Sequence, residues 1–214
     1  MNGDAEYIVF DLEWNIVGTE NNVPLKEQKK LPFEIIEIGA VKLDQNMSAV
    51  GSFSTLVKPV LYPVISRYIS RVTNRDQHSL SQGLLFPEAA NKFLDFVGGK
   101  TKIFCSWSKS DPPVLIDNFN FYGIEFFQPL ICLDVQALFS ILAEKVSVTT
   151  QRSIEYALDF LEIPCNRPLH SALNDAYYTA MILSKIWQQI EGDLNKKSRI
   201  LKSFQYQPSL KKRR

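Results

Sequence analysis

An apolar run that carries two carboxylates constrains this chain more than any other segment. Residues 7–14 read Tyr-Ile-Val-Phe-Asp-Leu-Glu-Trp, which is typical of a buried strand. Residues two apart on a strand point to the same face, so Asp11 and Glu13 are expected side by side, about 6–7 Å apart. Burying two like charges together is costly unless something neutralises them. The run therefore predicts a strand that meets a positive group, and a divalent cation is the simplest candidate.

Composition favours one folded domain without an extreme charge. The chain has 214 residues, 45% of them hydrophobic, and a formal net charge of +1. That size and apolar content suit a single core, so we expect a domain over residues 1–194 and a basic, flexible tail over 195–214. The polar N-terminus does not resemble a signal peptide, and no apolar run reaches the roughly 18 residues of a spanning helix. A cytoplasmic protein without a membrane partner is the resulting expectation.

The order of strand-like and helical patterns predicts the fold class. Strand-like runs cover residues 7–13, 33–43, 51–57, 102–106 and 130–133. Helical patterns cover residues 63–71, 79–85, 88–97, 112–122, 135–145, 153–161 and 171–190. A hairpin-type turn at residues 44–47 joins the second and third strands. We therefore predict an α/β fold with a mixed five-stranded sheet, an antiparallel three-strand meander plus parallel strands, flanked by helices.

Three further polar residues lie at or close to the start of predicted helices. Asp111 lies at the head of a helix, shortly after the strand that ends near residue 106. His170 and Asp175 are five residues apart, a turn of about 500° on a helix, so they cannot share a helix face. Ser171 is a good N-cap. We therefore expect the last helix to begin there, with His170 on the preceding loop and Asp175 facing the sheet.

Each of these residues also has a purely structural interpretation. Asp111 alone fits an N-cap before Pro112, and Asp175 alone fits an acidic residue in a first helical turn. His170 fits a loop histidine bonded to the backbone. Trp14 fits a core residue at a strand end. These alternatives explain the residues one at a time, but they explain four carboxylates together poorly.

Taken in order, the segments resemble the DEDDh exonucleases, the RNase T and DNA polymerase III proofreading superfamily with an RNase H-like fold. The resemblance rests on five segments: Phe10-Asp11-Leu12-Glu13, residues 34–41, residues 71–77, residues 106–111 and His170-x4-Asp175. It covers about residues 6–190 and is greatest toward the KapD and Eri-type exonucleases. Pro112 after Asp111 departs from the more usual polar helix start.

The resemblance implies a divalent-metal-dependent 3′→5′ exonuclease that releases nucleoside 5′-monophosphates by a two-metal mechanism. Asp11, Glu13 and Asp175 would hold one ion, and Asp11 would bridge to a second ion held by Asp111. Hard carboxylate oxygens suit Mg²⁺ or Mn²⁺ rather than zinc. His170 would be the general base, because its reference pKa of about 6.5 suits that role near neutral pH.

Single-stranded nucleic acid, either RNA or DNA, is the implied partner. Trp14, Asn15 and Ile16 follow the first acidic motif directly and are the candidates for substrate binding. Two other functions stay open at this point. A catalytically inactive nucleic-acid-binding or regulatory protein on the same fold would retain an oligonucleotide without releasing mononucleotides. A metal-dependent phosphatase or phosphodiesterase for small molecules would hydrolyse a nucleotide ester but not an oligomer.

Overall fold

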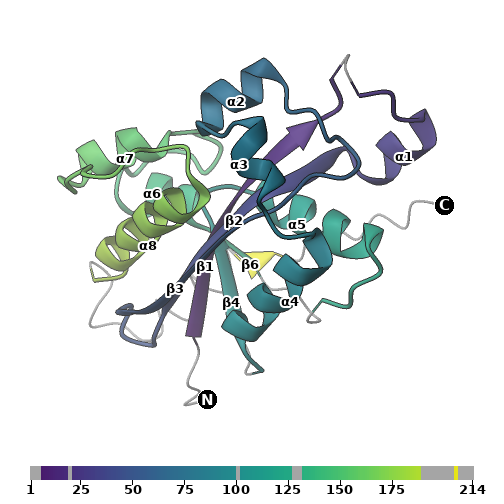
Figure 1. The fold of residues 1–214 in the computed structure, drawn as a ribbon. Helices are drawn as coiled ribbons and strands as arrows, with labels where there is room; N and C mark the ends of the chain where they lie inside the picture. Colours follow the sequence, from purple (N-terminus) through teal and green to yellow (C-terminus); the bar gives the residue numbers. More distant parts are fainter. Residues whose placement is uncertain (1–5, 19–20, 100–101, 127–131, 189–204, 207–214) are drawn as a thin grey trace.

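A mixed sheet forms the centre of the computed structural model, which describes residues 6–18, 21–99, 102–126, 132–188 and 205–206. Within these residues the sheet has six strands in the spatial order β3-β2-β1-β4-β5-β6 (Figure 1). The strands are β1 (Glu6–Ile16), β2 (Phe33–Leu43), β3 (Ala49–Leu56), β4 (Lys102–Ser106), β5 (Cys132–Asp134) and β6 (Gln205–Tyr206). The first three pair antiparallel, β4 and β5 extend the sheet in parallel, and β6 is antiparallel to β5.

The predicted meander and the predicted parallel strands are confirmed. β2 and β4 have the predicted bounds, whereas β1 continues to Ile16, three residues beyond the predicted end. The two-residue β6 adds a sixth strand to the five that were predicted, and it lies within the 195–214 segment. The predicted domain boundary at residue 194, the rest of that segment and the predicted helix end at residue 190 lie outside the described residues.

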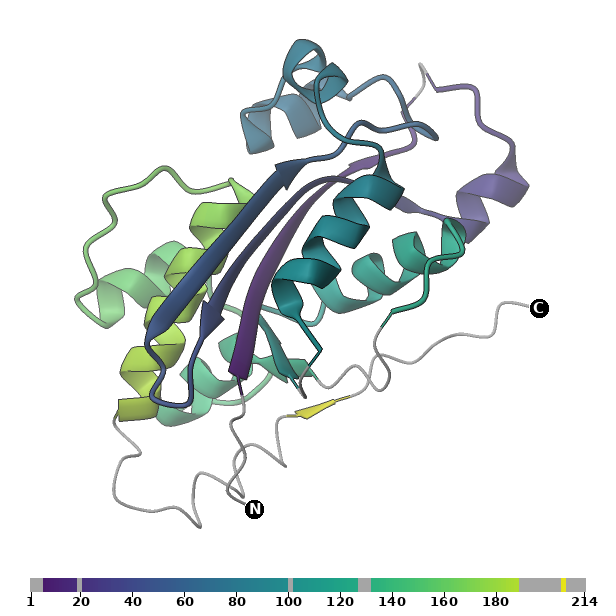
Figure 2. The same cartoon turned by 60° about the horizontal axis from the view of Figure 1, so that its bottom comes forward.

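Helices cover both faces of the sheet. They are α1 (Leu25–Lys30), α2 (Arg67–Thr73), α3 (Gln77–Ser81), α4 (Phe86–Val97), α5 (Asp111–Phe121), α6 (Val135–Leu142), α7 (Ile154–Phe160) and α8 (Ala172–Gln188). The helices α6, α7 and α8 lie on one face, and α4 and α5 lie on the other (Figures 1 and 2). In the part of the chain that is described, none of them combines the length and apolarity needed to span a bilayer.

The alternation of side chains along β1 divides the interior into two cores. Ile8 and Phe10 are fully buried in the core that includes α4 and α5. Tyr7 and Val9 are buried in the core on the other face, with α6, α7 and α8. Because alternate residues share a face, Asp11 continues the second row. The carboxylates of β1 therefore belong to the face that α8 covers.

Gly39 allows α8 to approach the sheet at that point. It lies on β2 as the direct partner of Asp11 in the antiparallel register. A Cβ atom on Gly39 would lie 2.1 Å from the carbonyl carbon of Ala172 and 2.1 Å from the backbone nitrogen of Leu173. Only a residue without a side chain fits there. The first turn of α8 is therefore seated directly on β2, next to Asp11.

We expect Gly39→Ala to destabilise the protein strongly, because the added methyl group meets backbone rather than a movable side chain. Overpacking of this kind should lower the free energy of unfolding by about 3 kcal/mol or more. Urea unfolding followed by circular dichroism measures the change. Gly99→Ala is the matched control, since a Cβ there would meet nothing within 4 Å. Equal stabilities of the two variants would contradict the proposed close contact.

Candidate metal and catalytic site

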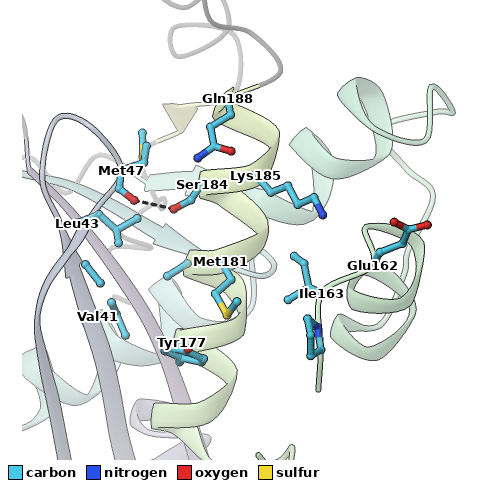
Figure 3. Close-up of a pocket in the computed structure, with 13 residues that line it drawn as sticks. Val41, Leu43, Met47, Glu162, Ile163, Tyr177, Met181, Ser184, Lys185 and Gln188 are labelled. Atoms are coloured by element: carbon cyan, nitrogen blue, oxygen red, sulfur yellow. Dashed lines mark hydrogen bonds between the residues drawn. The ribbon is translucent and has the colours of Figure 1, made fainter. Parts of the chain in front are cut away.

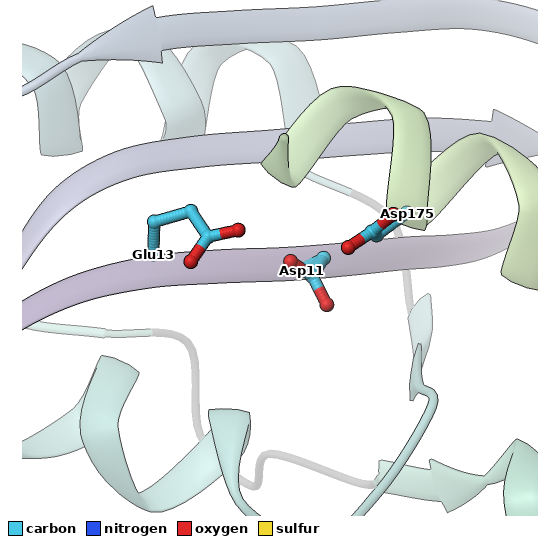
Figure 4. A group of neighbouring side chains, drawn as sticks. All are labelled: Asp11, Glu13 and Asp175. Carbon is cyan, nitrogen blue, oxygen red and sulfur yellow. The ribbon is translucent and has the colours of Figure 1, made fainter. Parts of the chain in front are cut away.

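Three carboxylates point toward one another where β1 passes the first turns of α8 (Figure 4). One oxygen from each of Asp11, Glu13 and Asp175 lies within 4.8 Å of the others. Oxygens that share one Mg²⁺ at about 2.1 Å are at most about 4.2 Å apart, so small side-chain rotations suffice to bring all three onto one ion. The set offers only hard oxygen donors and contains no thiolate or imidazole. The residues therefore fit a magnesium or manganese ion.

Asp111 reaches the same strand from the other helical layer. It is the first residue of α5 and is 5% exposed, and its Oδ1 accepts a 3.1 Å hydrogen bond from the backbone N–H of Leu12. The parallel pairing of β1 with β4 ends at Val9, so the N–H of Leu12 is free of that pairing and donates to Asp111. Asp111 is the strongest charged influence on Asp11. Its carboxylate thus faces β1 and the site, and Ser110 occupies the N-cap position instead.

His170 lies in the loop directly before α8, as the sequence predicted. Its backbone is in the left-handed region, with φ at 64°, and its N–H donates to both oxygens of Asp175 at 3.3 and 3.2 Å. The Tyr178 hydroxyl accepts a 2.6 Å bond from the N–H of Arg167 and so anchors the same loop to α8. His170 itself is exposed. This arrangement holds the main chain in place while the imidazole stays accessible to water.

The shared location raises the pKa of every one of the four carboxyls. Burial is the largest cause in each case, and it raises the pKa of Glu13 to about 8, of Asp111 to about 7 and of Asp175 to about 6. The pKa of Asp11 lies well above its usual range, first through burial and then through the charge of Asp111. Carboxyls that resist ionisation for these reasons bind a divalent cation favourably, because the ion removes their mutual repulsion.

The three residues predicted to contact substrate occupy different environments. Asn15 is fully buried, and its Nδ2 donates to the carbonyl oxygens of Tyr62 at 2.9 Å and Val64 at 3.0 Å. Trp14 and Ile16 are each partly exposed. The amide of Asn15 therefore fixes the loop at residues 62–64, whereas Trp14 and Ile16 have exposed surface that a ligand can contact.

Two charged residues beside the site, Glu37 and Arg75, could not be assigned to it from the sequence alone. Glu37 is 1% exposed and is the partner of Glu13 in the β1–β2 register. Its carboxylate accepts bonds from Nε of Arg75 at 2.9 Å and from Nη2 at 2.7 Å. Ser171, predicted to cap α8, instead directs its hydroxyl to Oε1 of Glu37 at 3.3 Å. The two-residue spacing of Glu37 and Gly39 indicates from the sequence that they share one face of β2. The register that pairs them with Glu13 and Asp11 on β1 cannot be read from the sequence.

A hollow elsewhere on the molecule is separate from this site. It has a volume of about 450 Å³ and lies between the C-terminal half of α8, the β2–β3 hairpin and the loop after α7 (Figure 3). Met47, Tyr177, Met181 and Ser184 are among its lining residues, and none of the four carboxylates is.

The chain belongs to the RNase T exonuclease family. The family model described as exonuclease matches residues 8–183. The DNA polymerase III PolC-type of Caldanaerobacter subterraneus subsp. tengcongensis is 34% identical over 96 residues, which are 45% of this chain. The matched part spans only 6% of that polymerase, so the comparison concerns one domain of it. The predicted membership of the DEDDh exonucleases is confirmed.

Solved structures with the same fold include several nucleases. The nuclease domain of 3′hExo, a DEDDh family member bound to rAMP, has a TM-score of 0.71 at 18% identity, covering 88% of this chain and 94% of that one. E. coli Exonuclease I in complex with a dA16 oligonucleotide has a TM-score of 0.66 at 12% identity, covering 93% of this chain and 42% of that one. At these identities the likeness is one of fold, and it confirms the predicted RNase H-like architecture.

We expect the metal-free protein to lose stability as the pH rises from 5.5 to 8.5. The raised pKa values mean that the folded protein binds more protons than the unfolded chain in this window, so the free energy of unfolding falls with pH. The loss should be about 2 kcal/mol or more. Urea unfolding in EDTA measures it, and Glu13→Gln should flatten the slope. A free energy of unfolding that increases across this window would contradict the raised pKa values of these carboxyls.

Proposed function

We propose that this protein is a divalent-metal-dependent 3′→5′ exonuclease that hydrolyses single-stranded RNA or DNA to nucleoside 5′-monophosphates. The observation that carries the proposal is the convergence of four carboxylates from β1, α5 and α8, beside a loop histidine, in a chain of an exonuclease family. Structures of the same fold include one that recognises a histone mRNA stem-loop and one that binds single-stranded DNA. Both nucleic acids are therefore reasonable substrates to test.

The carboxylates divide into two overlapping ligand sets. Asp11, Glu13 and Asp175 would hold one ion, which is supported by their separations of at most 4.8 Å. Asp11 and Asp111 would hold a second ion. The hydrogen bond from the N–H of Leu12 to Oδ1 of Asp111 supports this, because it holds the Asp111 carboxylate against β1 next to Asp11. When bound, such ions stabilise the attacking and leaving oxygens of an in-line phosphoryl displacement.

His170 would accept the proton of the attacking water at an unprotonated imidazole nitrogen. The water oxygen forms a bond to the phosphorus, the bond from phosphorus to the 3′-oxygen of the preceding nucleotide breaks, and that oxygen takes a proton from solvent. The products are a 5′-monophosphate and a shortened strand with a new 3′-hydroxyl. The exposed position of His170 and the anchoring of its main chain to Asp175 support this role.

The end of β1 would receive the terminal nucleotide. Trp14 and Ile16 follow Glu13 on the same strand and are partly exposed. The Trp14 ring packs against Phe33, and its exposed part would offer an aromatic surface on which a base stacks irrespective of its identity. Ile16 would add an apolar contact. Asn15 would act indirectly, because its amide holds the loop at residues 62–64 in place. Substrate binding here would bring the last phosphodiester toward the carboxylates, because Trp14 directly follows Glu13 on β1.

Asp11→Asn should abolish hydrolysis while the fold persists. Loss of metal stabilisation worth about 4 kcal/mol corresponds to a fall of about 1,000-fold in kcat. The assay follows 5′-labelled RNA and DNA oligomers in Mg²⁺ or Mn²⁺, where 3′→5′ digestion gives a ladder that EDTA suppresses. Asp159→Asn removes an exposed acid from α7 and is the control.

Two outcomes would refute the proposed activity. Wild-type digestion rates in Asp11→Asn would show that the carboxylates are not the catalytic site. An oligomer that wild-type protein retains without releasing mononucleotides would favour the non-catalytic binding protein instead. Hydrolysis of a small nucleotide ester alone would favour the small-molecule phosphodiesterase.

His170→Ala should lower kcat by about 10²- to 10⁴-fold, because it removes the general base. Mn²⁺ binding in the absence of nucleic acid should persist, since the four carboxylates are unchanged. Calorimetric titration with Mn²⁺ and single-turnover digestion measure the two effects separately. His78→Ala is the matched control, because His78 is also exposed but lies on α3, which contributes none of the proposed site residues. Equal rates for the two variants would exclude a role for His170 in proton transfer.

A further inference from the structure

Glu37 is a fifth carboxylate next to the proposed metal site. It is opposite Glu13 in the antiparallel register, and the Cβ atoms of such a pair lie about 4.5–5.5 Å apart. Its charge acts on Asp11, Glu13 and Asp175. It is nevertheless not part of the group whose oxygens come within 4.8 Å of one another. Something directs this carboxylate away from its neighbours.

Arg75 engages both oxygens of Glu37. Its Nε donates to Oε2 and its Nη2 donates to Oε1, a two-point contact that fixes the plane of the carboxylate. The main chain of Arg75 is itself held at the end of α2, where the Ser70 hydroxyl donates to its carbonyl oxygen at 2.6 Å and Thr73 Oγ1 accepts from its N–H at 3.3 Å. Arg75 is therefore a fixed cation rather than a mobile surface charge.

We propose that Arg75 is a positioning residue that keeps Glu37 out of the metal site, so that four carboxylates face the ions and not five. The inference rests on the proposed function. Without Arg75, the buried Glu37 would lack its ion-pair partner, and an unpaired buried charge is strongly unfavourable. A divalent ion at the adjacent cluster would then attract it. An extra anionic ligand strengthens ion binding but occupies a coordination position that water or the substrate phosphate requires.

The test measures Mn²⁺ binding by calorimetric titration without nucleic acid, together with kcat on a labelled oligomer. Arg75→Met should bind Mn²⁺ about threefold or more tightly, because the ligand charge at the site increases, and its kcat should fall about tenfold or more as a coordination position is lost. The double variant Arg75→Met/Glu37→Gln removes both charges. It should recover the wild-type Mn²⁺ affinity and most of kcat, although the ion pair stays broken.

Arg152→Met is the matched control for loss of an ion pair. Arg152 contacts Glu144 through Nε and Nη2, and the side-chain exposures of that pair, 32% and 8%, are similar to the 27% and 1% of Arg75 and Glu37. It should lower stability without changing Mn²⁺ affinity. Arg75→Lys keeps the charge but loses the two-point contact, so its Mn²⁺ affinity should lie between those of wild type and Arg75→Met. This second variant decides the matter if Arg75→Met does not fold.

The inference is overturned if Arg75→Met, or Arg75→Lys in its place, binds Mn²⁺ no more tightly than wild type. A double variant as impaired as Arg75→Met also overturns it, because the ion pair would then act only through stability. Wild-type protein that binds Mn²⁺ but digests no oligomer refutes the proposed function while leaving the role of Arg75 measurable. Wild-type protein that binds no Mn²⁺ refutes both.

Discussion

The contact between α8 and β2 at Gly39 is the constraint on which the site depends. Because backbone meets backbone there, the position of α8 along the sheet is fixed by sterics and not by adaptable side chains. Asp175 is one turn beyond that contact and reaches Asp11, while His170 lies just before it and is tied to Asp175 through its N–H. One glycine thus sets both the separation of the candidate metal-binding carboxylates and the position of the histidine.

The acidic cluster is unfavourable for folding on its own. Burial and like charge oppose ionisation of Asp11, Glu13, Asp111 and Asp175, and Arg75 is committed to Glu37. The two apolar cores on either side of β1 offset this cost. Such concentration of unfavourable charge in one place is expected of a functional site and not of a stabilising one. It also explains why a bound cation would stabilise the whole domain.

Local patterns predicted most of the fold and the acidic residues. The bounds of β2 and β4 and the loop position of His170 follow from alternation, turn residues and helix length, which are properties of neighbouring residues. The pairing of Glu37 with Arg75 and the bond from Leu12 to Asp111 join segments far apart in sequence, so no local pattern encodes them. The short β6 was missed for the same reason, because two residues carry no periodicity.

The parting of β1 from β4 after Val9 has a wider consequence. It opens a seam in the sheet through which α5, a helix of the opposite layer, inserts Asp111 beside Asp11. The candidate ligand set would therefore span the sheet, and it would be complete only when the helices of both layers have docked. The affinity for an ion would then depend on the packing of both cores. A substitution that damages either core is expected to weaken ion binding, even when it is distant from the carboxylates. A bound ion would then link the helical layers on the two faces of the sheet through Asp175 and Asp111.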